Sequence, residues 1–351
     1  MPDESLSFEP QFNNYLIGHD DAEQLFLRCW KNNSLHNSWL ISGIKGIGKA
    51  TLAFRLARFI LNADENNGEV YNSLEVSSEN KIFKLIAGNA HPDFKLLQRD
   101  YIKTDRRKIQ KAIESGEALD REELKNLKKS AYIVIDDVRT INEFLSHRSS
   151  GDGWRVVLID SIDDMNSSAA NSVLKILEEP PYKTLMLLIS HNPNRLLPTI
   201  RSRCAKLELK PLKDAEVASL LRRYRSQLAE DEIKKITSIA SGSIGKALRY
   251  ADNKAANCYN KLENILNNGE NFKLSEALDF CDNAVKDEDS YDLVQELLLK
   301  FLALRVQNTA KITETADCWS RAIKTFNEVE GLNLDKKQAL IGLITTICKQ
   351  I

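Results

Sequence analysis

The hydrophobic positions of the first 210 residues form two alternating patterns. Residues 39–41, 156–159 and 185–189 are continuous apolar runs rich in β-branched and leucine side chains, as in parallel strands that are buried on both faces. Between these runs, apolar residues recur every three or four positions, which is typical of helices that pack one face on a sheet. The alternation predicts an α/β domain with a parallel sheet over residues 1–210.

From residue 211 onward, the apolar positions follow helical spacing alone. Two helical faces precede a glycine stop at Gly242, which predicts a small helical lid domain over residues 211–256. Further helical stripes continue to the end of the chain and predict an all-helical bundle over residues 257–351. The pattern therefore predicts three domains.

A glycine-rich turn joins the first predicted strand to the first long helix. It reads SGIKGIGKAT, with four residues between Gly43 and Gly48 and with Lys49 next. Glycines such as Gly43, Gly46 and Gly48 allow successive backbone N–H groups to curve around an anion, and the helix start adds its positive dipole. Lys49 can reach the outer phosphates of a nucleotide. The stretch is therefore interpreted as a phosphate-binding P-loop.

The residues that would hold the metal of a bound nucleotide are incomplete. The hydroxyl that should follow the lysine and ligate Mg²⁺ is replaced by Ala50. Thr51 comes one position late, which turns it by about 100° on a helix of 3.6 residues per turn. The loop is thus expected to bind ATP with compromised metal chemistry, and no metal-binding residues are predicted.

Acidic residues follow the apolar run at 156–159. Asp160 closes the predicted strand, at the place where a P-loop protein holds its nucleotide-bound Mg²⁺. The next residue should orient the attacking water for hydrolysis, and it is Ser161, a poor base. Asp163 or Asp164 could replace it, begin the next turn, or cap the helix that starts near Ser167.

Two charged clusters stand out in the second half of this domain. One is at the end of the helix predicted at 167–179, and the other comes after the strand predicted at 185–189. The helix ends in Glu178-Glu179, where carboxylates oppose the helix macrodipole, so a contact with a neighbour is expected. Arg201 and Arg203 precede the last strand, predicted at 205–209. A planar guanidinium there can serve as an arginine finger on an adjacent subunit's phosphate, and a surface ion pair is the alternative.

Composition narrows the class of protein. The 351 residues carry a net charge of −1, so any contact with nucleic acid must be local. The six cysteines show no CxxC spacing and are expected to be reduced thiols. No signal peptide and no membrane span is recognised, so a soluble, cytoplasmic protein without membrane contact is expected. A nucleic-acid-binding module at the basic residues 103–129 is an alternative, ranked last because acids are mixed into that segment.

The order of four motifs resembles a known family. GxxxxGK, an apolar strand ending in Asp, LEEPP and SRC follow one another as in the AAA+ clamp-loader subunits of bacterial DNA polymerase III, most similarly to the delta-prime subunits. The resemblance covers about residues 14–210, and over residues 211–351 it rests on the helical layout only. It implies an AAA+ domain followed by a helical lid and a helical collar that oligomerises.

The resemblance also implies a role. Active members carry Ser or Thr, Glu and Arg at the positions that here hold Ala50, Ser161 and Gly245, whereas the arginine of the SRC motif, Arg203, is retained. A stator is therefore expected, which donates Arg203 to a neighbouring ATPase, binds ATP at most without hydrolysing it, and belongs to the polymerase holoenzyme. The implied partners are the motor subunits, the clamp-opening subunit, the sliding clamp and primer-template DNA. The alternative is an active motor subunit that uses Thr51 and Asp163 or Asp164.

One further module of the family is missing from this sequence. Members often carry four zinc-binding cysteines between the P-loop helix and an HPDF-like strand. This chain has no cysteine between residues 30 and 203, although it has the HPDF stretch at residues 91–94. No zinc is therefore predicted.

Overall fold

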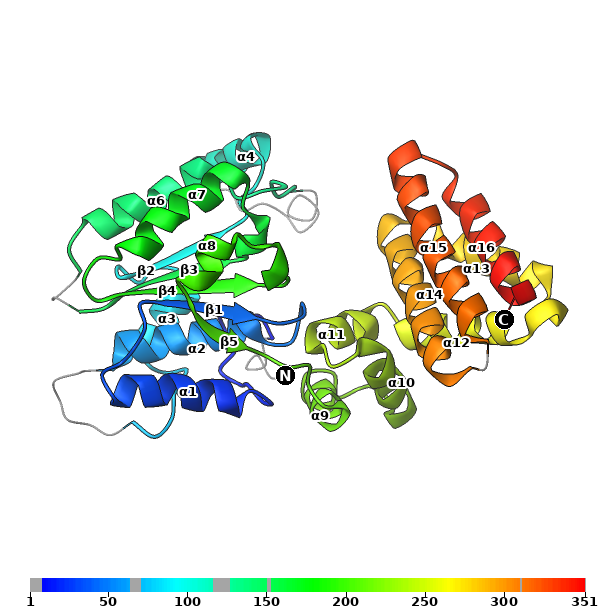
Figure 1. Ribbon diagram of the computed structural model, residues 1–351, viewed down its shortest axis with the longest axis horizontal. Coiled ribbons are helices and arrows are strands. Elements are labelled where there is room, and N and C mark those ends of the chain that lie inside the picture. The colour runs from blue at the N-terminus through cyan, green and yellow to red at the C-terminus, as the bar shows by residue number, and fades with distance from the viewer. Residues whose placement is uncertain (1–7, 64–70, 116–126, 150–152, 310, 351) are drawn as a thin grey trace. The chain divides into compact units, whose positions relative to one another are not determined.

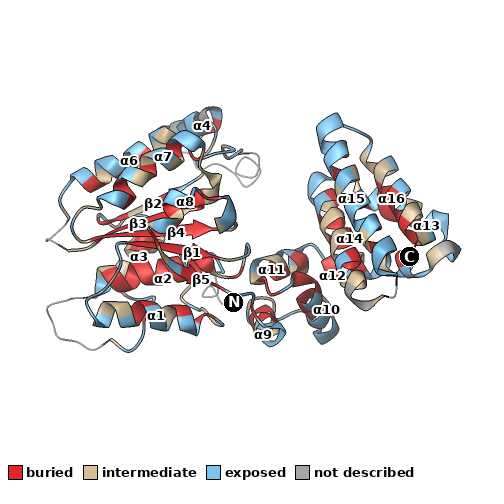
Figure 2. Ribbon diagram, in the orientation of Figure 1, coloured by how far each residue is buried: buried red, intermediate tan, exposed pale blue. Residues whose placement is uncertain are grey.

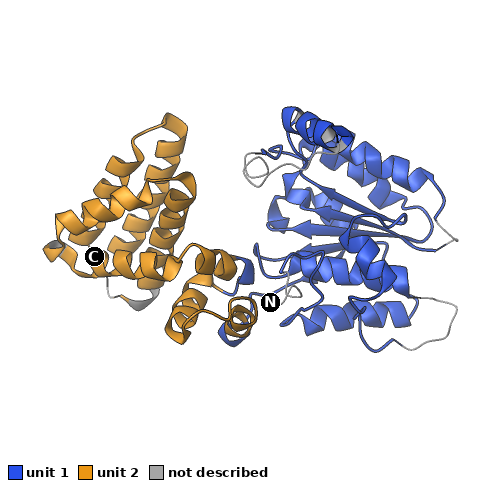
Figure 3. Cartoon of the chain, turned by 180° about the vertical axis from the view of Figure 1, so that it is seen from behind, with its two compact units in different colours: residues 1–216, 242–245 blue, residues 217–241, 246–351 orange. Residues whose placement is uncertain are grey.

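The computed structural model describes residues 8–63, 71–115, 127–149, 153–309 and 311–350. These residues divide into two compact units, which Figure 3 shows in different colours. The first unit comprises residues 1–216 with 242–245, and the second comprises residues 217–241 with 246–351. The three-domain division with boundaries at residues 211 and 257 stays a prediction.

A five-stranded parallel sheet forms the centre of the first unit, in the order β2-β3-β4-β1-β5 (Figure 1). Ser42 is in register with Ser190, and Asp160 with Ile189, so the carboxyl ends of β1, β3 and β4 meet at one edge. Ligands of open α/β sheets bind at this edge. The strands are β1 (Ser38–Ser42), β2 (Phe94–Gln98), β3 (Arg155–Asp160), β4 (Thr184–Ser190) and β5 (Ala205–Glu208).

Helices cover both faces of the sheet, and the central strands β3, β4 and β1 are almost entirely buried, whereas the edge strands β2 and β5 are partly exposed (Figure 2). Alternate residues of β3 enter the two cores: Val156 and Leu158 face one layer, and Val157 and Ile159 face the other. One layer contains α1 (Asp20–Lys31), α2 (Lys49–Asn62) and α3 (Lys81–Ala87). The other contains α6 (Ile135–Ser146), α7 (Ser167–Glu178) and α8 (Pro198–Ser202), and α4 (Lys103–Ser115) lies on the same side in Figure 1.

The second unit is helical throughout its described residues. Buried leucine, isoleucine and aromatic side chains at helical spacing hold its helices together, and α14 packs against α15 and α15 against α16. The helices are α9 (Asp214–Tyr224), whose first turn belongs to the first unit, α10 (Glu230–Ala240), α11 (Ile244–Asp252), α12 (Ala255–Asn267), α13 (Leu274–Ala284), α14 (Glu288–Asn308), α15 (Ile312–Leu332) and α16 (Lys336–Gln350).

The predicted fold class is confirmed. A P-loop joins strand β1 of a parallel sheet to helix α2, and a helical region follows this α/β part of the chain. The sequence analysis named no element over α3, and residues 116–126 of the charged segment lie outside the described residues. All six cysteines are free thiols. Among the described helices, none is both long enough and apolar enough to span a membrane.

Candidate functional site

The P-loop leaves the carboxyl end of β1 and enters α2. Its backbone needs glycine, because φ is +146° at Gly43 and +81° at Gly46, and a Cβ at Gly43 would lie 2.6 Å from the Leu209 carbonyl oxygen. Gly48 caps α2 without a side-chain hydrogen bond to the first turn. The loop and the first amides of α2 thus form a backbone cradle of the kind that binds phosphate.

The Lys49 side chain is folded into this loop. Its Nζ donates hydrogen bonds to the carbonyl oxygens of Gly43, at 2.6 Å, and Ile44, at 2.7 Å, and the residue is only 3% exposed. Burial lowers its pKa to about 8, and Lys45 adds to this, although Asp160 and Asp163 oppose it. The lysine thus lies in the loop, near enough to Asp160 and Asp163 for their charges to raise its pKa, and its contact with phosphates stays a prediction.

The donors for a divalent cation are sparse at this cradle. Ala50 has no side-chain oxygen, and Thr51 is buried in the first turn of α2. Burial raises the pKa of Asp160, and the charge of Lys49 opposes that shift. The loop thus suits the phosphates of a nucleotide better than their Mg²⁺. In the described part of the chain no group of three His, Cys, Asp or Glu could hold a metal ion, and the absence of zinc stays a prediction.

Asp163 ties the ends of β3 and β4 together. Its Oδ1 accepts hydrogen bonds from Ser190 Oγ (2.9 Å) and Asn192 N (3.1 Å), and its Oδ2 from Ser161 Oγ (2.8 Å) and His191 N (2.7 Å). Burial alone would raise the pKa of Asp163, but these hydrogen bonds outweigh it and lower the pKa. Because a carboxylate accepts about four hydrogen bonds, none remains for a water molecule.

The prediction that Asp163 or Asp164 caps the helix near Ser167 is wrong. Asp163 and Asp164 do begin the next turn, the 3₁₀ segment η1 (Ile162–Asp164), but the cap of α7 is Asn166, whose side chain accepts the Ala169 N–H at 2.9 Å. Asp164 forms an ion pair with Arg99 at 3.1 Å. Asp163 is thus fully hydrogen-bonded within the chain, whereas Asp164 has one ion pair and is one-third exposed.

Gly242–Gly245, which include the first two residues of α11, dock on the P-loop within the first unit. Ser243 Oγ donates a hydrogen bond to the Lys45 carbonyl oxygen, and Gly245 N donates one to the Gly46 carbonyl oxygen, both at 2.8 Å. A Cβ at Gly245 would lie 2.9 Å from Gly46 Cα. Position 245, where the family pattern has arginine, thus contacts the loop backbone directly.

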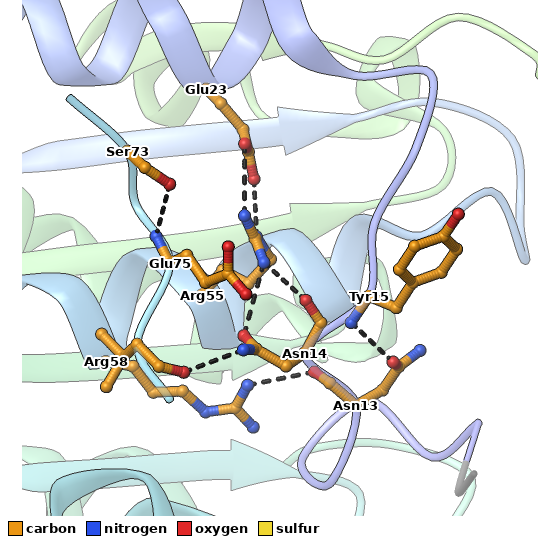
Figure 4. A network of polar contacts seen from close by, with 9 residues as sticks. Asn13, Asn14, Tyr15, Glu23, Arg55, Arg58, Ser73 and Glu75 are labelled. Atoms are coloured by element: carbon orange, nitrogen blue, oxygen red, sulfur yellow. Dashed lines mark hydrogen bonds and ion pairs between the residues drawn. The ribbon is translucent and has the colours of Figure 1, made fainter. Parts of the chain in front are cut away.

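Two arginines on α2 hold the N-terminal segment, a feature that the sequence analysis missed (Figure 4). Arg55 donates two hydrogen bonds to the Glu23 carboxylate and a third to the Asn14 carbonyl oxygen. Arg58 is fully buried, 3.8 Å from the Phe83 ring, and donates to the carbonyl oxygens of Asn13 and Gln11. The signal was available, because the two arginines stand three residues apart among the apolar residues 52–61 of the helix.

The segment held by these arginines continues to the P-loop. His19, the residue before α1, has its Nε2 2.7 Å from the Ile47 carbonyl oxygen of the loop. A Cβ at Gly48 would lie 3.0 Å from Leu16 Cδ1. The chain before α1 therefore forms one wall of the phosphate cradle.

Arg203 lies at the C-terminal cap of α8, away from the P-loop lysine in sequence but in the same unit. Its Nη2 is 2.7 Å from Glu178 Oε1, and its Nη1 donates to the Thr199 carbonyl oxygen at 3.0 Å. The side chains are 34% and 48% exposed. Within this chain Arg203 thus forms the surface ion pair that was the alternative to an arginine finger, while the finger role and a contact of the acidic end of α7 with a neighbour stay predictions.

Comparison with known proteins shows which family the chain belongs to. The family model described as DNA polymerase III, delta subunit matches residues 18–213. The chain belongs to this family. The resemblance to clamp-loader subunits of DNA polymerase III is therefore confirmed, and the matched residues contain the P-loop, Asp160 and Arg203.

Individual relatives of this family agree with the match. The chain is 31% identical over 209 residues to DNA polymerase III subunit delta′ of Pseudomonas aeruginosa, across 59% of this chain and 53% of that protein. It is 23% identical over 249 residues to subunit gamma of Buchnera aphidicola from Schizaphis graminum, across 70% and 59% of the two chains. The chain thus matches little more than half the length of these relatives. Among solved structures, a gamma subunit-related protein of Thermotoga maritima aligns with a TM-score of 0.46 at 17% identity, over 93% of this chain and 98% of that one.

Proposed function

We propose that this member of the family is a delta-prime-like clamp-loader subunit that donates Arg203 to the ATP site of a neighbouring subunit and does not hydrolyse ATP itself. One observation carries the proposal: both oxygens of Asp163 are occupied by four donors from the chain. With Ser161 at the position of the usual water-orienting acid, the site has no base for hydrolysis.

The P-loop keeps a binding role in this proposal. The amides around Gly43, Gly46 and Gly48, together with Lys49, hold the phosphates of ATP, while Ala50 supplies no oxygen for the metal. Thr51 and Asp160 complete the wall of the site. Bound nucleotide then serves as a structural support rather than as a substrate.

Arg203 acts outside its own nucleotide site. The guanidinium is one-third exposed and carries a planar fork that suits the oxygens of a phosphate. In a ring of loader subunits it stabilises the charge that develops on the γ-phosphate held by the neighbour. The chain would therefore be the rigid member of a clamp loader in the cytoplasm. It would act with the motor subunits, the clamp-opening subunit, the sliding clamp and primer-template DNA. Residues 211–256 would form its lid and residues 257–351 its collar.

The test is ATP turnover of a loader assembled from this chain and its partner subunits, with and without primed DNA. Arg203→Ala should lower turnover at least tenfold, because arginine fingers contribute about 10³–10⁵-fold in related phosphoryl transfers. Lys49→Ala should leave turnover unchanged. Arg195→Ala, at an exposed arginine eight residues away, is the matched control.

The alternative is an active motor subunit, in which Thr51 and Asp163 or Asp164 supply the metal and water groups. It predicts that Lys49→Ala removes one subunit's share of turnover. That result, or full activity of Arg203→Ala, would overturn the proposed function.

A further inference from the structure

Glu178 occupies the anion-binding side of Arg203. The carboxylate Oε1 is 2.7 Å from Arg203 Nη2, and the second guanidinium nitrogen is held at 3.0 Å by the Thr199 carbonyl oxygen. The carbonyl contact joins residues four apart in α8 and fixes the direction of the arginine side chain. The carboxylate is a negatively charged partner of the chemical kind that a phosphate oxygen would replace.

The position of Glu178 in its helix is unfavourable without Arg203. It is the last residue of α7, where the helix macrodipole repels a carboxylate. Its neighbour Glu179 takes part in no ion pair among the described residues, so of these two adjacent acids it is Glu178 that pairs with Arg203. The ion pair with Arg203 therefore offsets a local electrostatic cost.

The surroundings leave the pair open to an incoming group. Arg203 and Glu178 border an open depression of about 610 Å³, whose other walls include Pro180, residues 35–37 and the first residue of β1, Ser38. The side chains remain 34% and 48% exposed, and the hydroxyl of buried Ser38, at the same depression, has no partner among the described residues. An anionic group of a neighbouring subunit can thus approach Arg203 from this depression.

We propose that Glu178 is a positioning residue that holds Arg203 in a neutral ion pair until the phosphate of an adjacent subunit's nucleotide displaces the carboxylate. This inference rests on the proposed function. While the pair is closed, the guanidinium is correctly oriented but its charge is compensated. When the phosphate arrives, Arg203 exchanges one anionic partner for another and Glu178 is released to solvent.

The experiment separates the charge of Glu178 from its hydrogen bonding. In the assembled loader, Glu178→Gln keeps an oxygen that accepts from Arg203 and removes the competing charge. It should raise turnover without DNA, or lower the KM for ATP, by about two- to fivefold, the range of exposed ion pairs. The kcat with DNA should stay unchanged, because the pair is already open in the activated loader. Glu179→Gln is the matched control and should behave as wild type.

A double variant shows whether Glu178 acts through the arginine. Glu178→Gln combined with Arg203→Ala should equal Arg203→Ala alone. The inference is overturned if Glu178→Gln leaves both KM and DNA-independent turnover unchanged, or if it lowers kcat as Arg203→Ala does. A null result for Arg203→Ala itself would instead overturn the proposed function, so the two failures are distinguishable.

Discussion

The backbone N–H of Gly245 donates a hydrogen bond to the Gly46 carbonyl oxygen at 2.8 Å. A Cβ at Gly245 would lie 2.9 Å from Gly46 Cα, closer than real Cβ contacts allow. The helix start and the P-loop thus fit together because position 245 has no side chain. An arginine at this position, as in the family pattern, requires the loop backbone to move.

Gly245→Ala should destabilise the first unit by about 1–3 kcal/mol, the usual cost of overpacking a tight contact. Urea unfolding monitored by tryptophan fluorescence measures this, in a Trp319→Phe background so that the remaining tryptophans, Trp30, Trp39 and Trp154, all report on the first unit. Gly88→Ala is the control, since its Cβ would meet ordinary contacts at 3.4 Å or more. Equal unfolding midpoints for the two variants would contradict the tight fit.

Asp163→Asn and Asp160→Asn should have opposite effects on stability. Asparagine at 163 offers one carbonyl oxygen to two backbone N–H donors, so we expect the free energy of unfolding to fall by about 2 kcal/mol. Asparagine at 160 removes a charge that burial disfavours, so the variant should be as stable as wild type or more stable. The same urea assay at pH 7 compares them. A destabilised Asp160→Asn beside a neutral Asp163→Asn would refute the assignment.

The stabilisation by Asp163 should also depend on pH. Since the folded protein lowers the pKa of this carboxyl, its contribution is fully present above the ordinary aspartate pKa. It is lost as the pH falls through the lowered folded-state value. The difference in unfolding free energy between wild type and Asp163→Asn should therefore shrink in acid, and a difference that grows there would show the wrong sign.

Lys49 should change stability with the same sign of pH dependence as Asp163, but in an alkaline range, because its pKa is also lowered in the folded protein. Burial lowers its pKa from 10.5 to about 8, so the cost of the buried ammonium is constant below that value. Between pH 8 and 10.5 the unfolded chain binds more protons, and wild type should gain stability relative to Lys49→Met. The urea assay at several pH values measures the difference. A difference that stays constant across this range would contradict a buried lysine with a lowered pKa.

Arg58→Ala should release the N-terminal segment from α2. The fully buried guanidinium holds the carbonyl oxygens of Gln11 and Asn13 and stacks on Phe83, so its loss leaves a cavity and unpaired carbonyls. Limited proteolysis should cut the variant within residues 8–15 faster than wild type. Arg28→Ala, an exposed change on α1, should be cut as wild type is. Equal cleavage of all three proteins would show that the anchor is unimportant.

The sequence predicted those features whose signal is local. The P-loop, its lysine and the strands around it follow from glycine spacing and continuous apolar runs. The short helix α3 was missed because its signal is weak: seven residues with an Asn80 cap and two buried apolar side chains.

Contacts between distant parts of the chain could not be read from the pattern. The docking of Gly245 on Gly46 joins residues almost 200 positions apart, and the donors to Asp163 come from the carboxyl end of β4 and from the residues just after β3 and β4. Glu178 and Arg203 were noted separately, but their ion pair depends on how α7 and α8 pack. Spacing shows which side chains are present, and only the fold decides which of them meet.

The central claim is that the chain accelerates hydrolysis at a neighbour's site and contributes none of its own. A rapid-quench burst measurement, with labelled ATP in excess over the loader, tests both parts, since the burst amplitude counts hydrolysing sites and the burst rate reports the chemical step. We predict that Lys49→Ala keeps the wild-type amplitude and rate, while Arg203→Ala keeps the amplitude and slows the rate at least tenfold. A reduced amplitude for Lys49→Ala with an unchanged rate for Arg203→Ala would contradict the account.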